Sequence, residues 1–493
     1  MRNESANPRL ATQGREAARG AASLFVAQFT LMLSSYVVVL ALARALGPEL
    51  YGAYGIVYSF LLSIELIGRL GLPQALSKLI ADARTSAPVL EATGFTLAAI
   101  VYATIFAGFW LAAPALGTLF HVADGARLFR IAAIDIPFYG VYFICNHILT
   151  GRRLFHAASL GTVVYGLSKA AGILILVQIG PSVAGALVVN AIGSIVALAV
   201  VVPFVGRAPL RLTLAQRRPI IRLAVPVALI ALGTQTVISI DLWVLNAVGT
   251  AVDDAIKGLY VAAVNVARIP NFLSFVMTAV LVPTIAAALA ANDHEAARSY
   301  LGGAMRFMAV ALIPGCTLIA INAPEVLALL FSADYAPGAD LLVVLIFAHG
   351  LCFTTFLSLA NVLIGAGRAT TAACLSLVAL AFAAALSVTL VLWAGALGAA
   401  WAALIANAAA LVGASLVVGR VVAVPVGASI LARVLLLTAL IGGASWWIEG
   451  RGPMLLVELA LLGLVYVALL PVAGLLGRTD VEPFLPEWAK RAG

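Results

Sequence analysis

The residues best suited to chemistry are a few ionisable side chains inside long apolar runs of the sequence. An ionisable group in the middle of a membrane helix costs ~2.5–3.5 kcal/mol on insertion scales, so each one is a candidate for function. Arg268 is the first candidate, because its planar guanidinium can hold a phosphate or carboxylate group through two parallel hydrogen bonds. Asn265 lies three residues earlier and therefore shares its helical face. Asp241, in the preceding run, could form a salt bridge with Arg268. Such a pair could be structural, or it could be a coupling switch.

A second set of candidates follows one stripe of an earlier apolar run. Tyr54, Tyr58, Glu65 and Arg69 are four, seven and four residues apart, which keeps them on one helical face. Tyrosines can stack on sugars and form hydrogen bonds with them. Glu65 could bind and release a proton, since burial favours the neutral form of a carboxyl group. The alternative is a structural ion pair between Glu65 and Arg69, four residues apart.

A third helical face carries Asp135, Tyr139, Tyr142 and Asn146. Lys169, in the following run, could neutralise Asp135 across a helix–helix contact. We favour this structural pair over a path for sugars. Two further polar residues have simpler interpretations: His349 is expected to be a hydrogen-bonded packing residue, and Glu458 is expected to reach the membrane interface.

Several chemistries have no motif in the chain. There is no GxxxxGK[ST] nucleotide-binding loop, no HExxH and no cluster of Cys and His residues. The four cysteines lie in apolar runs without a CxxC spacing, so we expect small buried hydrophobes rather than disulfides or metal ligands. No nucleophile–base pair is evident. The sequence therefore predicts no catalytic site, no cofactor and no metal. The functions that remain are binding of a ligand and exchange between conformations.

The elements that must position these residues are membrane helices. The chain has 493 residues, of which 63% are hydrophobic and only 10% are charged, against ~25% charged in soluble domains. This composition excludes a water-soluble enzyme. Since a membrane-spanning helix needs ~20 apolar residues, the pattern predicts an all-α integral membrane protein with about 14 transmembrane helices. We place these at 22–45, 53–70, 93–116, 128–149, 158–179, 183–205, 224–247, 258–289, 302–322, 340–364, 371–393, 396–419, 432–448 and 454–476.

The distribution of positive charge predicts the topology. Placing both termini in the cytoplasm assigns 22 of the 29 Lys and Arg residues to the inner side and 5 to the outer side, with Lys169 and Arg268 inside spans. Cytoplasmic loops are normally the ones enriched in Lys and Arg. This asymmetry explains the net charge of +8 without nucleic acid as a partner. We therefore expect a multi-pass protein of the inner (cytoplasmic) membrane.

The chain also contains an internal repeat. NHILTGRR from Asn146 corresponds to NVLIGAGR from Asn361, and ALVVN ending at Asn190 corresponds to ALIAN ending at Asn407. Parallel repeats with a substrate path between them are a transporter architecture. A basic linker between the halves could be a topology anchor, which we favour, or could bind anionic headgroups. The predicted organisation is a cytoplasmic tail (1–20), a six-helix lobe (21–205), the linker (206–223), a second six-helix lobe (224–420), two further helices (421–478) and a cytoplasmic tail (479–493).

Four segments carry a family resemblance: 43–81 with LGPELYG and GLPQAL, 259–283, 329–345 and 361–368. In their order and spacing the chain resembles the oligosaccharide flippases of the multidrug/oligosaccharidyl-lipid/polysaccharide superfamily. The resemblance implies two six-helix lobes in a V around a central cavity. It also implies a polyprenyl-pyrophosphate-linked oligosaccharide as cargo, moved from the inner to the outer leaflet for exopolysaccharide, capsule or O-antigen synthesis. Glycosyltransferases and a polysaccharide polymerase would be partners, beside membrane lipids.

Three alternative functions remain at this point. A cation-coupled multidrug antiporter of the same superfamily usually has twelve spans. A lipid II flippase typically has several Arg residues in its first span, whereas here Arg44 lies only at the end of that span. A membrane glycosyltransferase or ligase would need a large external loop with acids or His, and the predicted loops are short.

Overall fold

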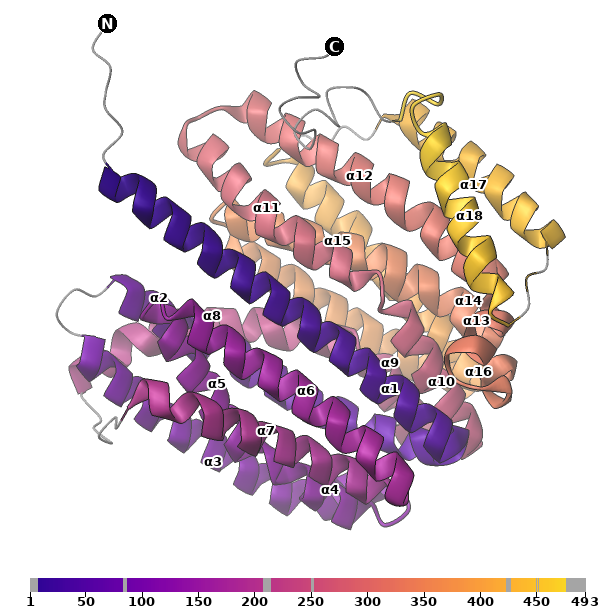
Figure 1. Ribbon diagram of the computed structural model, residues 1–493. Coiled ribbons are helices and arrows are strands. Elements are labelled where there is room, and N and C mark those ends of the chain that lie inside the picture. The colour runs from indigo at the N-terminus through magenta and orange to yellow at the C-terminus, as the bar shows by residue number, and fades with distance from the viewer. Residues whose placement is uncertain are drawn as a thin grey trace, which may run out of the picture. The chain divides into compact units, whose positions relative to one another are not determined.

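The computed structural model describes residues 8–82, 87–206, 214–249, 252–422, 427–448, 450 and 452–475, and in these ranges the regular elements are helices only. Ten helical stretches of this part of the chain are long and apolar enough to cross a membrane. The protein is thus an all-α integral membrane protein, as predicted (Figure 1). The count of fourteen spans remains a prediction.

Two of the ten stretches contain a break where the sequence predicts the end of one span and the start of the next. Helix α1 (Pro8–Leu70) is interrupted at Gly47, whose φ of 71° lies in the left-handed region that favours glycine. Helix α16 (Ala369–Gly419) is interrupted at Ala394 and at Gly395, where φ is 58°. Because α1 begins at Pro8, part of the expected N-terminal tail is helical.

The chain divides into two compact units, 1–258 and 259–493. In the first unit α1 packs against α6, α6 against α7, and α5 against α7 (Figure 1). Close approach depends on small residues, as is usual in membranes. A Cβ at Gly166 of α6 would lie 3.2 Å from the Cα of Leu31 in α1. The helices after α1 are α2 (Leu72–Asp82), α3 (Ala87–Leu119), α4 (Gly125–Ala133), α5 (Asp135–Gly151), α6 (Phe155–Ile179), α7 (Val183–Val205), α8 (Leu214–Val237) and α9 (Ile240–Val248).

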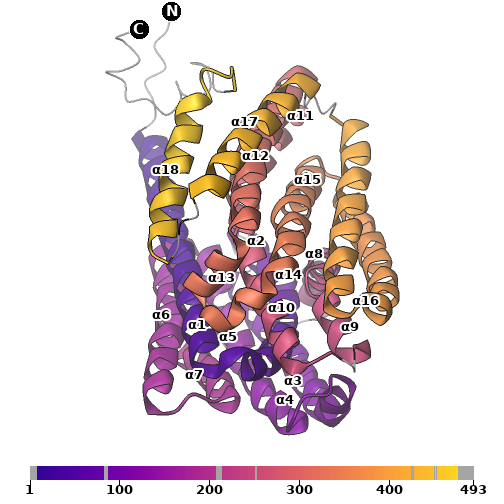
Figure 2. The same ribbon diagram turned by 90° about the vertical axis from the view of Figure 1, so that its right-hand side faces the viewer.

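The second unit begins within α10, and in it α15 packs on α11 and α16 while α12 packs on α17. Figure 2 shows α17 beside α12, with α18 next to α17. Its elements are α10 (Asp254–Ala267), α11 (Asn271–Ala290), α12 (His294–Ile321), α13 (Ala323–Leu330), the 3-10 helix η1 (Ala333–Gly338), α14 (Ala339–Leu345), the π-helix η2 (Ile346–Phe353), α15 (Thr354–Gly365), α16, α17 (Ala428–Ile448) and α18 (Met454–Leu469).

The boundary between the units lies further along the chain than the predicted linker. Helices α8 and α9 belong to the first unit, although the repeat assigns them to the second lobe. The linker residues 207–213 and the C-terminal tail lie outside the described residues, and the linker is helical from Leu214. The two six-helix lobes inferred from the repeat remain a prediction.

Buried polar contacts attach the C-terminal helices to α12. Glu458 of α18 is 4% exposed; it accepts hydrogen bonds from the Ser445 hydroxyl at 2.6 Å and the Gly450 amide at 2.8 Å. Asn322, directly after α12, donates to Ser445 at 2.8 Å. These donors, from α17 and from the loop that follows it, bury the carboxylate within the protein; the expected position of Glu458 at the membrane interface remains a prediction.

An ion pair ties α5 to α3 in the first unit. The guanidinium of Arg152, which directly follows α5, donates to both carboxylate oxygens of Glu91 on α3, at 2.7 and 2.5 Å. It also donates to the Val205 carbonyl at the end of α7, at 3.0 Å. The hydrogen bonds to Glu91 raise the pKa of Arg152, so this side chain stays charged at every accessible pH.

Candidate functional site

Three polar side chains from three helices meet inside the first unit. Glu65 of α1, Asp135 of α5 and Asn190 of α7 are all buried. The Asn190 amide donates to an Asp135 carboxyl oxygen at 2.5 Å and makes a weaker contact with Glu65 at 3.5 Å. Both carboxyl groups thus approach the same amide group. Two carboxylates that share a site repel each other, so a proton on one of them would stabilise the pair. We call these three residues the carboxyl cluster.

Lys169 of α6 is the cation that the sequence predicts as the partner of Asp135, but its ammonium group does not contact Asp135 directly. Its ammonium donates to the hydroxyls of Tyr165 at 3.1 Å and Tyr58 at 3.4 Å. It also lies over both rings, 4.8 and 5.5 Å from their centroids. The predicted ion pair is therefore wrong in its geometry, since phenol hydroxyls hold the ammonium and Asn190 holds Asp135. Lys169 still attracts both carboxyl groups through space.

The tyrosines of the α1 stripe form a stack. The rings of Tyr54 and Tyr58 are 5.2 Å apart and nearly parallel, and Tyr51 continues the stack at 6.1 Å from Tyr54. Tyr51 and Tyr54 are buried, whereas Tyr58 is half-buried and touches Lys169. The side chain of Arg69 lies outside the described part of the chain. Its pairing with Glu65 therefore remains a prediction.

A cavity of about 210 Å³ adjoins the predicted face of α5. Its aromatic walls include Tyr139, Tyr142 and Tyr165, and the last two rings are stacked 5.4 Å apart. Asn146 donates to the hydroxyl of Tyr142 at 3.2 Å and to that of Thr162 at 3.1 Å. Aromatic faces beside amide and hydroxyl groups suit a ligand with both apolar and polar surfaces. Sequence reasoning missed Tyr165 and Thr162, because they come from the neighbouring helix α6.

Asp241 and Arg268 lie at breaks in two membrane helices. Asp241 is in the first turn of α9, and Arg268 directly follows α10. Each charge has the sign that its helix end favours, since a helix N-terminus attracts anions and a C-terminus attracts cations. Asn265 is half-buried one turn before Arg268. Asp241 belongs to the first unit and Arg268 to the second, and their mutual pairing remains a prediction.

Asn190 is the member of the carboxyl cluster that the site prediction missed. The signal that could have found it is the repeat, because Asn190 ends ALVVN and Asn407 ends ALIAN. Asn407 of α16 donates to the Ala348 backbone carbonyl in η2 at 3.2 Å. A π-helical segment often marks a functional position. The two asparagines thus have different partners, a carboxyl group for Asn190 and a backbone carbonyl for Asn407.

Comparison with known proteins gives the family and the fold. The sequence profile described as polysaccharide biosynthesis protein matches residues 17–289. A search of curated proteins finds no match.

Several solved structures have a similar fold. The lipid II flippase MurJ, in an inward closed conformation, matches with a TM-score of 0.74 and 14% identity over 90% of this chain and 97% of that one. An inward-facing multidrug resistance MATE family transporter of the MOP superfamily matches with a TM-score of 0.71 and 17% identity, over 79% of this chain and 94% of that one. A MOP superfamily transporter from Pyrococcus furiosus, described as having a binding pocket of reverse polarity, matches with a TM-score of 0.60 and 16% identity. The match covers 82% of this chain and 95% of that one.

Proposed function

The chain belongs to the polysaccharide biosynthesis protein family, and we propose that it is a flippase for a lipid-linked oligosaccharide. The cargo would be a polyprenyl-pyrophosphate carrier bearing the sugar unit, moved from the inner to the outer leaflet by alternating access. The observation that carries the proposal is the carboxyl cluster with Lys169 and the tyrosines, all within the first unit. Ionisable groups buried among membrane helices typically mark a substrate or proton path.

The roles follow from the chemistry of the cargo. Tyr54, Tyr58 and Tyr139 would contact sugar rings, and Lys169 would attract the anionic headgroup. Arg268, supported by Asn265, would hold the pyrophosphate, and Asp241 would compete for Arg268 when the cargo leaves. The chain would catalyse no covalent step. Its partners would be the glycosyltransferases that supply the cargo and a polymerase that consumes it.

Two forces are available for export. A headgroup with about two negative charges moves outward down an inside-negative potential, at ~2.3 kcal/mol per charge per 100 mV. Glu65 and Asp135 would add a second force, because a carboxyl pair that shares one proton can release it on one side of the membrane and regain it on the other. The potential alone suffices if the empty carrier returns without a compensating charge.

The test is transport by the purified protein in proteoliposomes that contain a lipid-linked oligosaccharide. We expect Arg268→Ala to slow flipping roughly tenfold or more, since hydrogen bonds to charged groups contribute about 1.5–3 kcal/mol. Arg268→Lys keeps the charge without the planar fork and should lose less. Arg222→Ala, at an exposed position, is the control for loss of one positive charge. A normal flipping rate in Arg268→Ala at normal abundance would contradict the role of Arg268.

A multidrug antiporter is the second candidate function, and the similarity to a MATE family transporter favours it. The similarity to a lipid II flippase favours a third cargo. The same proteoliposomes distinguish these cargos, because an organic cation, lipid II and the lipid-linked oligosaccharide can each be offered alone. Transport of the cation or of lipid II, without movement of the oligosaccharide carrier, would replace the proposal.

The orientation of the protein in the membrane is tested by reporter fusions. The charge distribution predicts that reporters after Gly14, Arg217 and Arg491 are cytoplasmic and that one after Asp253 is external. An external reporter at Arg217 would overturn this topology, because it would place the basic linker on the side that the positive-inside rule disfavours.

A further inference from the structure

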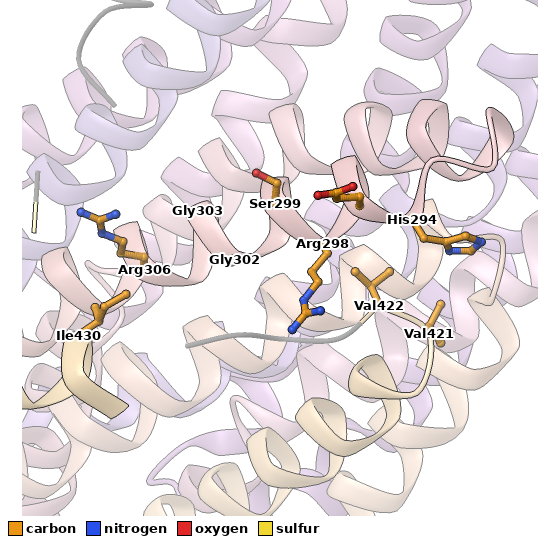
Figure 3. Close-up of a pocket in the computed structure, with 10 residues that line it drawn as sticks. His294, Arg298, Ser299, Gly302, Gly303, Arg306, Val421, Val422 and Ile430 are labelled. Carbon is orange, nitrogen blue, oxygen red and sulfur yellow. The ribbon is translucent and has the colours of Figure 1, made fainter. Parts of the chain in front are cut away.

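A cavity of about 860 Å³ lies in the second unit, apart from the carboxyl cluster. It is bounded by the first turns of α12, by the turn after α16 and by the start of α17 (Figure 3). By the charge distribution this end of α12 is cytoplasmic. The lining residues are His294, Glu295, Arg298, Ser299, Gly302, Gly303, Arg306, Val421, Val422 and Ile430.

The cavity is positively charged. Figure 3 shows Arg298 extending from α12 into the space beside Val421 and Val422. Arg298 is exposed and, among the described residues, forms no ion pair or side-chain hydrogen bond. Arg306 is held at the cavity by hydrogen bonds to the backbone carbonyls of Gly474 and Leu475. Glu295 is the single acid among the lining residues, so two guanidinium groups outnumber it.

The shape of the cavity admits a bulky group with an apolar part. A Cβ at Gly303 would meet no atom within 4 Å, so the cavity has free space beside this residue. Val422 and Ile430 supply an apolar wall. Large apolar side chains on the same two helices are exposed, namely Phe307 on α12 and Leu431 and Leu435 on α17.

We propose that this cavity binds the headgroup of an anionic phospholipid from the predicted cytoplasmic leaflet. The guanidinium of Arg298 would hold the phosphate, Arg306 two turns further along α12 would add to the positive charge, and the acyl chains would lie along the exposed apolar residues of α12 and α17. Basic pockets between membrane helices on the cytoplasmic side have this preference. A free phosphate would use the cations but neither the apolar wall nor most of the volume. The bound lipid would bridge α12 and α17.

The experiment measures phosphatidylglycerol binding to the full-length protein by native mass spectrometry, with phosphatidylcholine as the zwitterionic probe. We expect phosphatidylglycerol to bind more tightly. Arg298→Ala should weaken its binding about fivefold, the factor typical of one cation facing anionic lipid. Gly303→Trp fills the cavity without changing any charge and should remove the site. Arg153→Ala, at an exposed position outside both the cavity and the basic linker, is the control and should leave the binding of this lipid unchanged.

Three results would overturn the proposal. The first is equal binding of both phospholipids by the unaltered protein. The second is an equal loss in Arg153→Ala and Arg298→Ala, which indicates charge attraction without a site. The third is full displacement of phosphatidylglycerol by millimolar inorganic phosphate or, at equal concentration, by a polyprenyl diphosphate, which assigns the cavity to a free anion or to the cargo. None of these readouts requires transport, so failure here leaves the flippase proposal standing.

Discussion

Replacing Glu65 with Gln is expected to abolish the dependence of transport on the pH gradient while its dependence on membrane potential persists. Glutamine has nearly the same size and is also polar, so the packing of α1 against α5 should survive. It cannot release a proton, however, so Glu65 and Asp135 can no longer couple proton movement to transport. The measurement uses proteoliposomes loaded with a lipid-linked oligosaccharide, with ionophores that set potential and pH gradient independently.

The chain offers a matched control for this substitution. Glu458 is another buried carboxyl group bonded to a hydroxyl, but it lies between α17 and α18. Glu458→Gln should therefore leave the gradient dependence unchanged. If Glu65→Gln also leaves it unchanged, Glu65 has no part in coupling and returns to the structural pair with Arg69. Loss of both dependences at once would indicate a general block of transport rather than loss of proton coupling.

The second large effect is expected for Arg152→Ala, which should lower the free energy of unfolding by ~3 kcal/mol. The substitution leaves the Glu91 carboxylate, 7% exposed, without its partner, and an uncompensated buried charge typically costs ~3–5 kcal/mol. The lower value applies because the Arg152 side chain is 32% exposed and water screens part of the interaction. Equilibrium unfolding of the purified protein in detergent measures the change.

Two variants make this stability prediction specific. Arg127→Ala removes an ion pair with Asp124 whose side chains are 69% and 59% exposed, so it should have little effect on unfolding. Adding Glu91→Gln to Arg152→Ala removes the stranded charge and should restore part of the loss. Equal effects of Arg127→Ala and Arg152→Ala, or no recovery in the double variant, would show that the buried charge is not the cause.

Much of the fold could be predicted because a bilayer admits so few solutions. A long apolar run must be helical there, since no water is present to satisfy its backbone groups. The Gly47–Pro48 step and the break at Gly395 fall between predicted spans for the same local reason, the permissive backbone of glycine. Residues at helical spacing, such as Tyr54 and Tyr58, share a face in the structure because the helix period fixes that spacing.

The sequence could predict which residues belong to the site, but it could not predict which of them contact one another. Asp135 and Lys169 were predicted to pair across a helix–helix contact, but the partner of each depended on side chains from other helices. Asn190 on α7 occupies Asp135, and tyrosines on α1 and α6 occupy Lys169. Sequence spacing says nothing about such contacts, because it relates residues within one helix only.

By itself, the sequence determined that this chain is helical, lies in the membrane and carries its few ionisable groups on defined helical faces. The apolar composition and the helical spacing of the residues suffice for these predictions, since both depend only on residues that are near one another in the chain. The tertiary structure decided that Glu65 and Asp135 both approach the amide of Asn190 and that Glu458 is buried against Ser445. It also decided that Arg298 faces an open cavity beside α16 and α17. These outcomes depend on which helices pack together, and therefore on residues that are far apart in the chain.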